Sequence, residues 1–268
     1  MARGSARRMI NKYWADRVAK AQTAITDKNL KQIEKQLAIY YSSVMKKVIN
    51  DFEATYNKLQ NTIERGKEPT PADLYKLEKY WQLQAQTRAE LEKLGKRTST
   101  IMSKVFELEC FEIYHALGIE GLQSFNTLDK QMINQMINSI WVADGKNYSQ
   151  RLWENTEKLA ATLNEQLIYC VASGKKTTDL KKLLQERFDV SYHRADTLAR
   201  TELVHIQTQA AQKRYEDYGI QYVEVLVDPD ARTCDKCKEL IGEKFLTTAT
   251  PPLPVHPNER CCLIPVID

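Results

Sequence analysis

The chain has 268 residues with 28% charged side chains and only nine glycines and eight prolines, a composition that indicates one or two largely helical domains. No run of eighteen apolar residues occurs, which argues against a membrane-spanning helix, and the basic residues 1–8 are followed by no apolar stretch of the secretory type. Charge is uneven: residues 1–65 hold 13 Lys+Arg against 6 Asp+Glu (+7), whereas residues 191–268 hold 9 against 12 (−3). Any contact with DNA phosphates is therefore expected in the basic N-terminal arm, residues 1–65.

Helical spacing dominates the first half of the chain. From about residue 5 to 65, apolar residues recur every three or four positions, which predicts long amphipathic helices that pack in a bundle or against a second copy of the chain. Thr70 and Asp73 predict the capped start of the next helix, which we expect to stop at Gly95. Further helices are predicted over about 101–118 and 132–141. Residues 1–144 thus form a predicted N-terminal helical region.

After a turn at residues 144–146, helical spacing continues and then changes to strand spacing. Helices are predicted over about 152–173, 180–188 and 192–218. Residues 221–227 alternate and are rich in β-branched side chains, so they predict a strand, with shorter strands at 244–246 and 262–266. The predicted fold is mainly α with a small C-terminal α+β module, and residues 145–268 form the second predicted region.

Four of the six cysteines lie in the last thirty-five residues, where their spacing is typical of zinc. Cys234 and Cys237 form a Cys-x2-Cys pair; eighteen residues separate Cys237 from His256, and four separate His256 from Cys261. This pattern predicts a Cys3His zinc site in a knuckle over residues 228–268, with Cys262 as a competitor for the fourth position. Four protein ligands leave no open coordination position, so the zinc would be structural.

Four other interpretations remain open. The cysteines could be buried, reduced thiols, or a thioredoxin-like pair, although residues 228–233 suggest a turn rather than a helix start before Cys234. A zinc hydrolase or nuclease could use His193, His205 or Glu259, and would need an open metal position. A cellular zinc protein could bind nucleic acid through the basic arm.

Several motifs in the same order resemble the phage Mu F-like family of minor head, or head morphogenesis, proteins. The motifs are Ala-Arg-Thr-Glu at 199–202, Tyr-Gly-Ile at 218–220, the segment 230–237, Leu-Ile-Gly at 240–242, Phe245 and the segment 251–261. The family's ending, His-Pro-Asn-Cys-Arg-Cys, aligns with residues 256–261, so Cys261 matches its last cysteine. Glu259 replaces the first cysteine, and Cys262 is extra. The resemblance covers roughly residues 145–268.

The resemblance implies a role in phage head assembly rather than catalysis. It implies a minor capsid protein that binds the portal, major capsid or scaffold protein and lies in the virion, inside the head or at the portal vertex, after synthesis in the bacterial cytoplasm. Arg200 and Glu202 lie two positions apart on one helix and do not face each other. We expect them either to form structural ion pairs with the C-terminal module or to belong to a solvated charged face.

Overall fold

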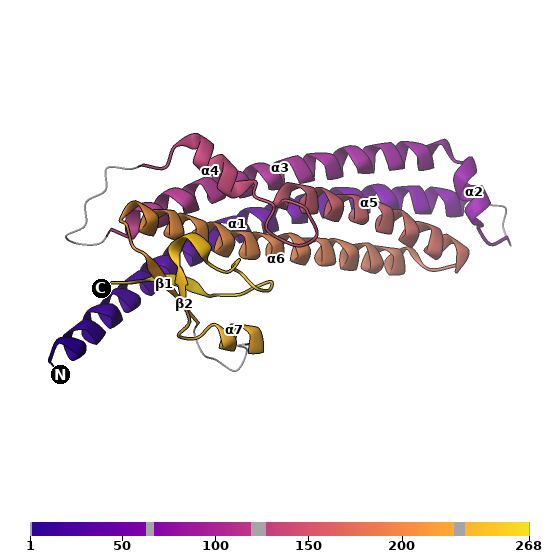
Figure 1. The fold of residues 1–268 in the computed structure, drawn as a ribbon. Helices are drawn as coiled ribbons and strands as arrows, with labels where there is room; N and C mark the ends of the chain where they lie inside the picture. The colour runs from indigo at the N-terminus through magenta and orange to yellow at the C-terminus, as the bar shows by residue number, and fades with distance from the viewer. Residues whose placement is uncertain (1, 63–66, 119–126, 228–233, 268) are drawn as a thin grey trace. The chain divides into compact units, whose positions relative to one another are not determined.

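The computed structural model describes the backbone of residues 2–62, 67–118, 127–227 and 234–267 (Figure 1). Its elements, in order, are α1 (Ala2–Thr62), α2 (Pro71–Lys76), α3 (Glu78–Ala116), α4 (Lys130–Ile137), α5 (Tyr148–Ala172), α6 (Thr177–Asp217), β1 (Tyr222–Leu226), α7 (Asp235–Glu239), β2 (Lys244–Leu246), the 3-10 helix η1 (Thr247–Ala249) and β3 (Cys262–Val266). The protein is therefore mainly helical with a small C-terminal sheet, as its sequence predicts. Within the described ranges, no helix has the continuous apolar length that crossing a bilayer requires.

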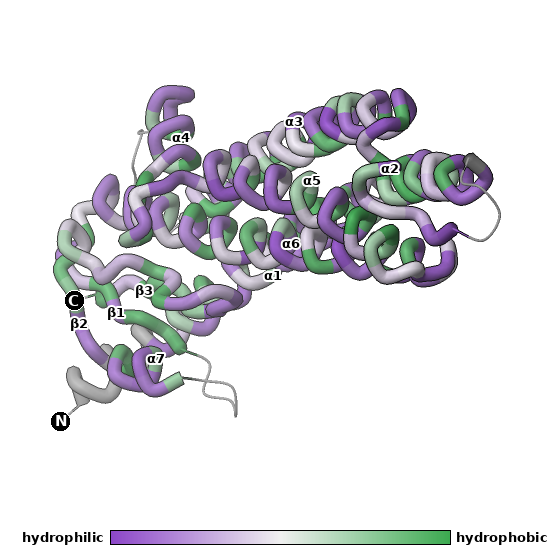
Figure 2. Tube along the Cα trace, turned by 90° about the vertical axis from the view of Figure 1, so that its right-hand side faces the viewer, coloured by the Kyte–Doolittle hydropathy of each residue, from purple (hydrophilic) through white to green (hydrophobic). Residues whose placement is uncertain are grey.

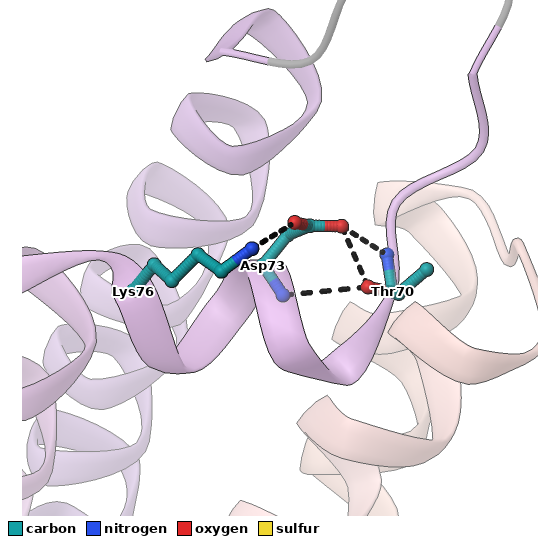
Figure 3. Close-up of polar contacts among 3 residues, drawn as sticks. All are labelled: Thr70, Asp73 and Lys76. Carbon is teal, nitrogen blue, oxygen red and sulfur yellow. Dashed lines mark hydrogen bonds and ion pairs between the residues drawn. The ribbon is translucent and has the colours of Figure 1, made fainter.

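The predicted start of the second helix is confirmed in detail. The Thr70 side chain accepts a hydrogen bond from the backbone N–H of Asp73, and the Asp73 carboxylate accepts one from the Thr70 backbone N–H (Figure 3). Lys76 also pairs with Asp73, at 3.3 Å. These contacts lower the pKa of Asp73, with the Thr70 side chain as the main cause. The capping box satisfies backbone donors that would otherwise lack partners at the helix start.

The expected helix stop at Gly95 is wrong, because α3 continues through this residue to Ala116. A Cβ atom at position 95 would lie 2.9 Å from Cζ3 of Trp153 and 3.3 Å from Oγ1 of Thr156. The missing side chain therefore lets the backbone of α3 approach the indole ring closely. A glycine in a helical pattern can serve either purpose, a C-cap or a close approach, and here the second applies.

The two helices predicted over 180–188 and 192–218 form one helix, α6, which begins at Thr177 and ends at Asp217. The intervening residues contain neither glycine nor proline, and Ser191 is buried, so the chain has no reason to leave the helix. Gly174 and Gly219, by contrast, end α5 and α6 with positive φ angles of 57° and 71°. These two helix ends agree with the prediction.

The strands form an antiparallel sheet in the order β2-β1-β3. In β1, Val223 and Val225 are buried, whereas Tyr222 is 40% exposed, which is the alternation that the sequence predicts. In β3, residues 262–265 are all buried, because other parts of the protein cover both faces of this edge strand.

The chain divides into two compact units. The first, which we call the helical unit, comprises residues 34–101 and 149–196. Hydrophobic and hydrophilic residues alternate at short intervals along its helices (Figure 2). Its buried side chains include Phe52, Leu91, Leu163 and Phe188. The Tyr56 hydroxyl also lies within hydrogen-bond distance of the carbonyls of Cys170 and Lys175, and it can donate to one of them at a time.

The second, which we call the mixed unit, comprises residues 1–33, 102–148 and 197–268. Its core joins the sheet to parts of three helices. The buried residues are Val18 of α1, Ile113 of α3 with the adjoining Leu117, Ala210, Ala211 and Tyr215 of α6, and Val223, Val225, Val227, Cys237, Leu253, Cys261, Cys262, Leu263 and Ile264 from the C-terminal segment. The C-terminal module therefore shares one core with the start of the chain instead of folding around a core of its own.

A buried chain of hydrogen bonds reinforces this core. The Gln22 amide donates to the carbonyl of Leu263 in β3, and the Gln207 amide donates to the side-chain oxygen of Gln22. Thr26 Oγ1 lies 2.6 Å from the amide oxygen of Gln207 and 2.5 Å from a carboxyl oxygen of Glu109. A hydroxyl carries only one hydrogen, so Thr26 can donate to both oxygens only in turn.

Protonation of Glu109 resolves this conflict, because its carboxyl group can then donate to Thr26 while Thr26 donates to Gln207. Burial raises the pKa of Glu109 from 4.5 to about 7, partly opposed by the hydrogen bonds from Thr26 and Asn29. Glu112 raises this pKa slightly and Lys28 lowers it. The orientation of β3 thus depends on hydrogen bonds that begin at a titratable group in α3.

Candidate metal centre

Cys234 and Cys237 lie at the start of the short helix α7. Cys234 is its N-cap, and the Cys234 sulfur accepts a hydrogen bond from the backbone N–H of Cys237 at 3.4 Å. The two sulfur atoms are also 3.4 Å apart. The pair therefore opens a short helix, in which a cysteine sulfur takes the role of a capping oxygen. The turn expected over 228–233 lies outside the described residues.

His256 presents one ring nitrogen to this pair. Its Nδ1 lies 2.9 Å from the carbonyl oxygen of Pro257, and its Nε2 lies 3.3 Å from the sulfur of Cys237. A carbonyl can only accept, so Nδ1 carries the proton and Nε2 is left with its lone pair. This is the tautomer in which Nε2 can bind a metal ion, and a backbone carbonyl on the other nitrogen is the usual orienting partner.

Cys261 and Glu259 approach Cys237 as well. The ligand atoms of Cys234, Cys237 and His256 all lie within 4.8 Å of one another, and so do those of Cys237, Glu259 and Cys261. Cys237 is common to both groups. The four residues of the predicted site therefore lie in two overlapping groups, together with a carboxylate that the predicted ligand set does not contain.

Cys262 belongs to neither group among the described residues. It is the first residue of β3, opposite Leu226 in β1, and only 5% of its surface is exposed. Burial raises its pKa to about 12. These properties are those of a small apolar core residue, although the assignment of the fourth ligand itself stays a prediction.

The chemistry of the donors suits a cation. Burial raises the pKa of Cys237 to about 11 and that of Cys261 still further, with Glu259 as a second cause for Cys261. The backbone N–H of Cys237 lowers the pKa of Cys234. Thiols in such surroundings ionise readily only when a positive charge is close by, and Zn²⁺ provides one. Sulfur, imidazole and carboxylate ligands are the set that zinc prefers.

The other histidines considered for metal chemistry have different surroundings. His205 is buried, stacks on Trp141 at 4.3 Å between ring centroids, and has Nδ1 2.8 Å from the carbonyl oxygen of Leu253. Its Nε2 lies 2.5 Å from the Gln209 amide nitrogen. His193 is exposed and lies edge-on to Tyr192. Within the described ranges, neither histidine joins a group of three metal-type ligands.

Trp141 also contacts Glu202, one of the two residues predicted to form ion pairs. The indole N–H donates to the Glu202 carboxylate at 3.1 Å, and Glu202 is only 2% exposed. The ion pairs of Arg200 and Glu202 with the C-terminal module stay a prediction. No sequence pattern predicts the Trp141 contact, because Trp141 belongs to a predicted helix, whereas α4 ends at Ile137.

Comparison with known proteins shows what this region is. The family model described as "Phage Mu protein F like protein" matches residues 161–264, which include the whole candidate metal centre. Residues 161–264 are therefore similar to the phage Mu F-like family. This confirms the resemblance to head morphogenesis proteins that the sequence motifs indicate. The match includes β1, β2, α7 and the last twelve residues of α5, in addition to α6 and the Cys/His cluster.

A curated relative also shares part of this chain. It is "NAD(+)--arginine ADP-ribosyltransferase EFV" of Enterococcus faecalis (strain ATCC 700802 / V583), which is 32% identical over 73 residues. The match covers 27% of this chain and 15% of the relative, so the chain spans only a small part of that protein. No solved structure matches the chain.

Proposed function

We propose that this protein is a minor head protein of a tailed phage that acts in head assembly and enters the virion. The observation that supports this proposal is the Mu F-like region over residues 161–264. Its partners would be the portal protein, the major capsid protein or a scaffold protein. Co-expression with the portal protein of the same phage, followed by pull-down and mass measurement of the complex, tests it. Recovery of a complex of defined mass is expected, and an unbound portal protein would count against a portal-docking role.

The Cys/His cluster would then hold one structural zinc ion, with Cys234, Cys237, His256 and Cys261 as the predicted ligands. Three features support a structural role: the donors come from α7 and from the loop before β3, Cys237 and Cys261 are buried in the core, and Cys261 directly precedes β3. A metal ion here would connect the knuckle to the sheet. Mass spectrometry of the purified native protein should find one zinc per chain, whereas a folded protein without metal would exclude this role.

The exposed basic residues of the N-terminal helix support a contact with packaged DNA. Lys12, Arg17 and Lys20 are exposed, and Arg17 lies over the ring of Trp14 at 5.0 Å. Trp14 and Val18 of the same segment are buried, so deleting the arm would damage the core. Changing the three basic residues to glutamine is the cleaner test.

We expect this triple variant to bind duplex DNA more weakly and with a smaller salt dependence. With fewer phosphate contacts, binding releases fewer counterions from the DNA. A matched control replaces the exposed Lys79, Lys158 and Lys182 of the helical unit by glutamine, which changes the net charge equally. Equal weakening in both variants would mean that net charge alone, and not the arm, determines binding.

An enzymatic role has less support. The curated relative is named an arginine ADP-ribosyltransferase, but the shared segment is 15% of its length. A zinc hydrolase or nuclease would need an open metal position, whereas the donors here are numerous enough to close the coordination sphere. Assay of the zinc-loaded protein against duplex and single-stranded DNA, with no cleavage expected, tests this alternative.

A further inference from the structure

Glu259 stands out in the metal centre because its carboxylate is buried and only one of its two oxygens accepts hydrogen bonds. The residue is 4% exposed. One carboxylate oxygen, Oε2, accepts hydrogen bonds from the backbone N–H groups of Val255 and His256. The other oxygen, Oε1, has no hydrogen-bond partner. A buried charged oxygen without a partner is costly, so its presence requires an explanation.

The loop before β3 explains why this carboxylate points inward. Asn258 adopts a left-handed backbone conformation, with φ of 63°, which asparagine tolerates better than most residues. The chain therefore reverses between Pro257 and Glu259, and the Glu259 side chain folds back over the backbone of residues 255 and 256. With Oε2 fixed by two backbone donors, the carboxylate is held in one orientation.

In that orientation, the ligand atom of Glu259 lies within 4.8 Å of the sulfur atoms of both Cys237 and Cys261. Ligands 2.0 to 2.3 Å from a zinc ion at tetrahedral angles are roughly 3.3 to 3.8 Å apart. Separations of at most 4.8 Å are compatible with donors around a single ion after a modest contraction on binding. A cation at this position would also satisfy the unpartnered oxygen.

We propose that Glu259 binds the metal ion directly, as an oxygen ligand beside Cys237 and Cys261. This inference rests on the proposed zinc site and goes beyond it, since the predicted ligand set contains only sulfur and nitrogen donors. The centre then has five donors for one ion: three thiolates, one imidazole and one carboxylate. The ordinary alternative is a carboxylate that only stabilises the loop through Oε2 and accepts a weak hydrogen bond from a thiol.

Replacement of Glu259 by glutamine separates these two roles. The glutamine oxygen can still accept from the Val255 and His256 N–H groups, so the loop is retained, but the side chain then presents an NH2 group where Oε1 was. We expect Glu259→Gln to keep its circular dichroism spectrum and to bind Zn²⁺ at least about 10-fold more weakly. Cys262→Ser, whose sulfur lies outside both groups, is the matched control and should bind Zn²⁺ as the native protein does.

A weaker affinity alone could also come from an indirect effect, so the ligand sphere must be observed directly. Co²⁺ in place of Zn²⁺ gives sulfur-to-metal charge-transfer absorption that increases with the number of bound thiolates. In Glu259→Cys, a thiolate replaces the carboxylate, and we expect this absorption to rise above that of the native protein with one Co²⁺ per chain. An unchanged spectrum in Glu259→Cys, or unchanged Zn²⁺ affinity in Glu259→Gln, would overturn the proposal.

The same measurements distinguish this inference from the zinc site itself. If the native protein binds neither Zn²⁺ nor Co²⁺, the metal site and the role of Glu259 fail together. If the native protein binds one ion and both Glu259 variants match it in affinity and spectrum, the zinc site stands and only the carboxylate ligand is wrong.

Discussion

The helical unit and the mixed unit bury different kinds of polar groups. Among the described residues, the buried polar side chains of residues 34–101 and 149–196 are hydroxyls and one amide, such as Thr98 and Asn155. The mixed unit buries ionisable groups, Glu109, Glu202, His205 and Glu259, in addition to neutral ones such as Gln22 and Gln207. The stability of a core with neutral polar groups changes little with pH or metal concentration. Where ionisable groups are buried, the free energy of unfolding depends on proton and metal binding.

This difference leads to four predictions. The largest expected effect on stability is that of losing the metal ion. Cys237 belongs to both ligand groups, so Cys237→Ser or treatment with a strong chelator should remove the ion. Structural zinc contributes about 10 kcal/mol or more to folding in isolated zinc-finger peptides. Here we expect on the order of several kcal/mol, since the sheet also packs on helices. Amide hydrogen exchange should accelerate in β1 and β3 and stay unchanged in α5.

Serine at position 262 provides the control for that experiment, because it changes a buried cysteine of the same strand without removing a predicted ligand. If Cys237→Ser leaves exchange in β1 and β3 as slow as in Cys262→Ser, the metal ion does not stabilise the mixed unit.

The second prediction concerns protons. Because the pKa of Glu109 is raised from 4.5 in the unfolded chain to about 7 in the folded protein, its contribution to stability is complete below pH 4.5. It is then lost as the pH rises through 7, and by pH 8 the loss reaches about 3 kcal/mol at most. Glu109→Gln, which stays neutral, should flatten the denaturant stability between pH 5 and 8. If the stability of the native protein changes with pH over this range in the same way as that of the variant, Glu109 does not become neutral in the folded protein.

The third prediction tests close packing in the helical unit. Gly95→Ala places a Cβ atom 2.9 Å from the ring of Trp153. Overpacking of this kind costs about 1–3 kcal/mol, while alanine regains about 1 kcal/mol of helix propensity. We expect a net loss of about 1 kcal/mol in thermal or denaturant unfolding. Trp153→Phe should remove the penalty, so that Gly95→Ala in this background is neutral or stabilising.

The smallest effect is expected at the helix cap of Figure 3. Thr70→Ala removes the hydrogen bond from the Asp73 backbone N–H to the Thr70 side chain and should cost about 0.5 kcal/mol, with little dependence on metal. Thr100→Ala is the control, because the exposed Thr100 hydroxyl only bonds back to the Lys96 carbonyl of its own helix. Equal losses in the two variants would mean that the capping box does not stabilise the unit.

The difference between the two units also explains which features could be predicted from the sequence alone. Apolar periodicity predicts the existence of α1, α3, α5 and α6, because the apolar residues at helical spacing are the ones that these helices bury. It cannot decide between the two uses of Gly95, since the partner, Trp153, is distant in sequence. It also divides α6 in two, because polar residues interrupt the spacing near Ser191.

In the metal centre, local spacing identifies the Cys234–Cys237 pair and His256, which the structure brings together. Glu259 appears in the sequence only as a departure from the family's cysteine. Its inward orientation depends on the left-handed turn at Asn258 and on two backbone donors, neither of which a pattern of residue types contains. The hydrogen-bond chain from Glu109 to Leu263 spans more than 150 residues of sequence and escapes any local pattern.

The discontinuous make-up of the mixed unit bears on the order of events during synthesis. Its segments are residues 1–33, 102–148 and 197–268, whereas every residue of the helical unit lies before 197. On the ribosome, the helical unit has its full sequence first, and domains tend to fold as soon as they can. Val18 must wait for β1 and β3, the last strands to emerge. Until then this apolar segment is open to other binding partners, so a chaperone or an early assembly partner would find its best opportunity there.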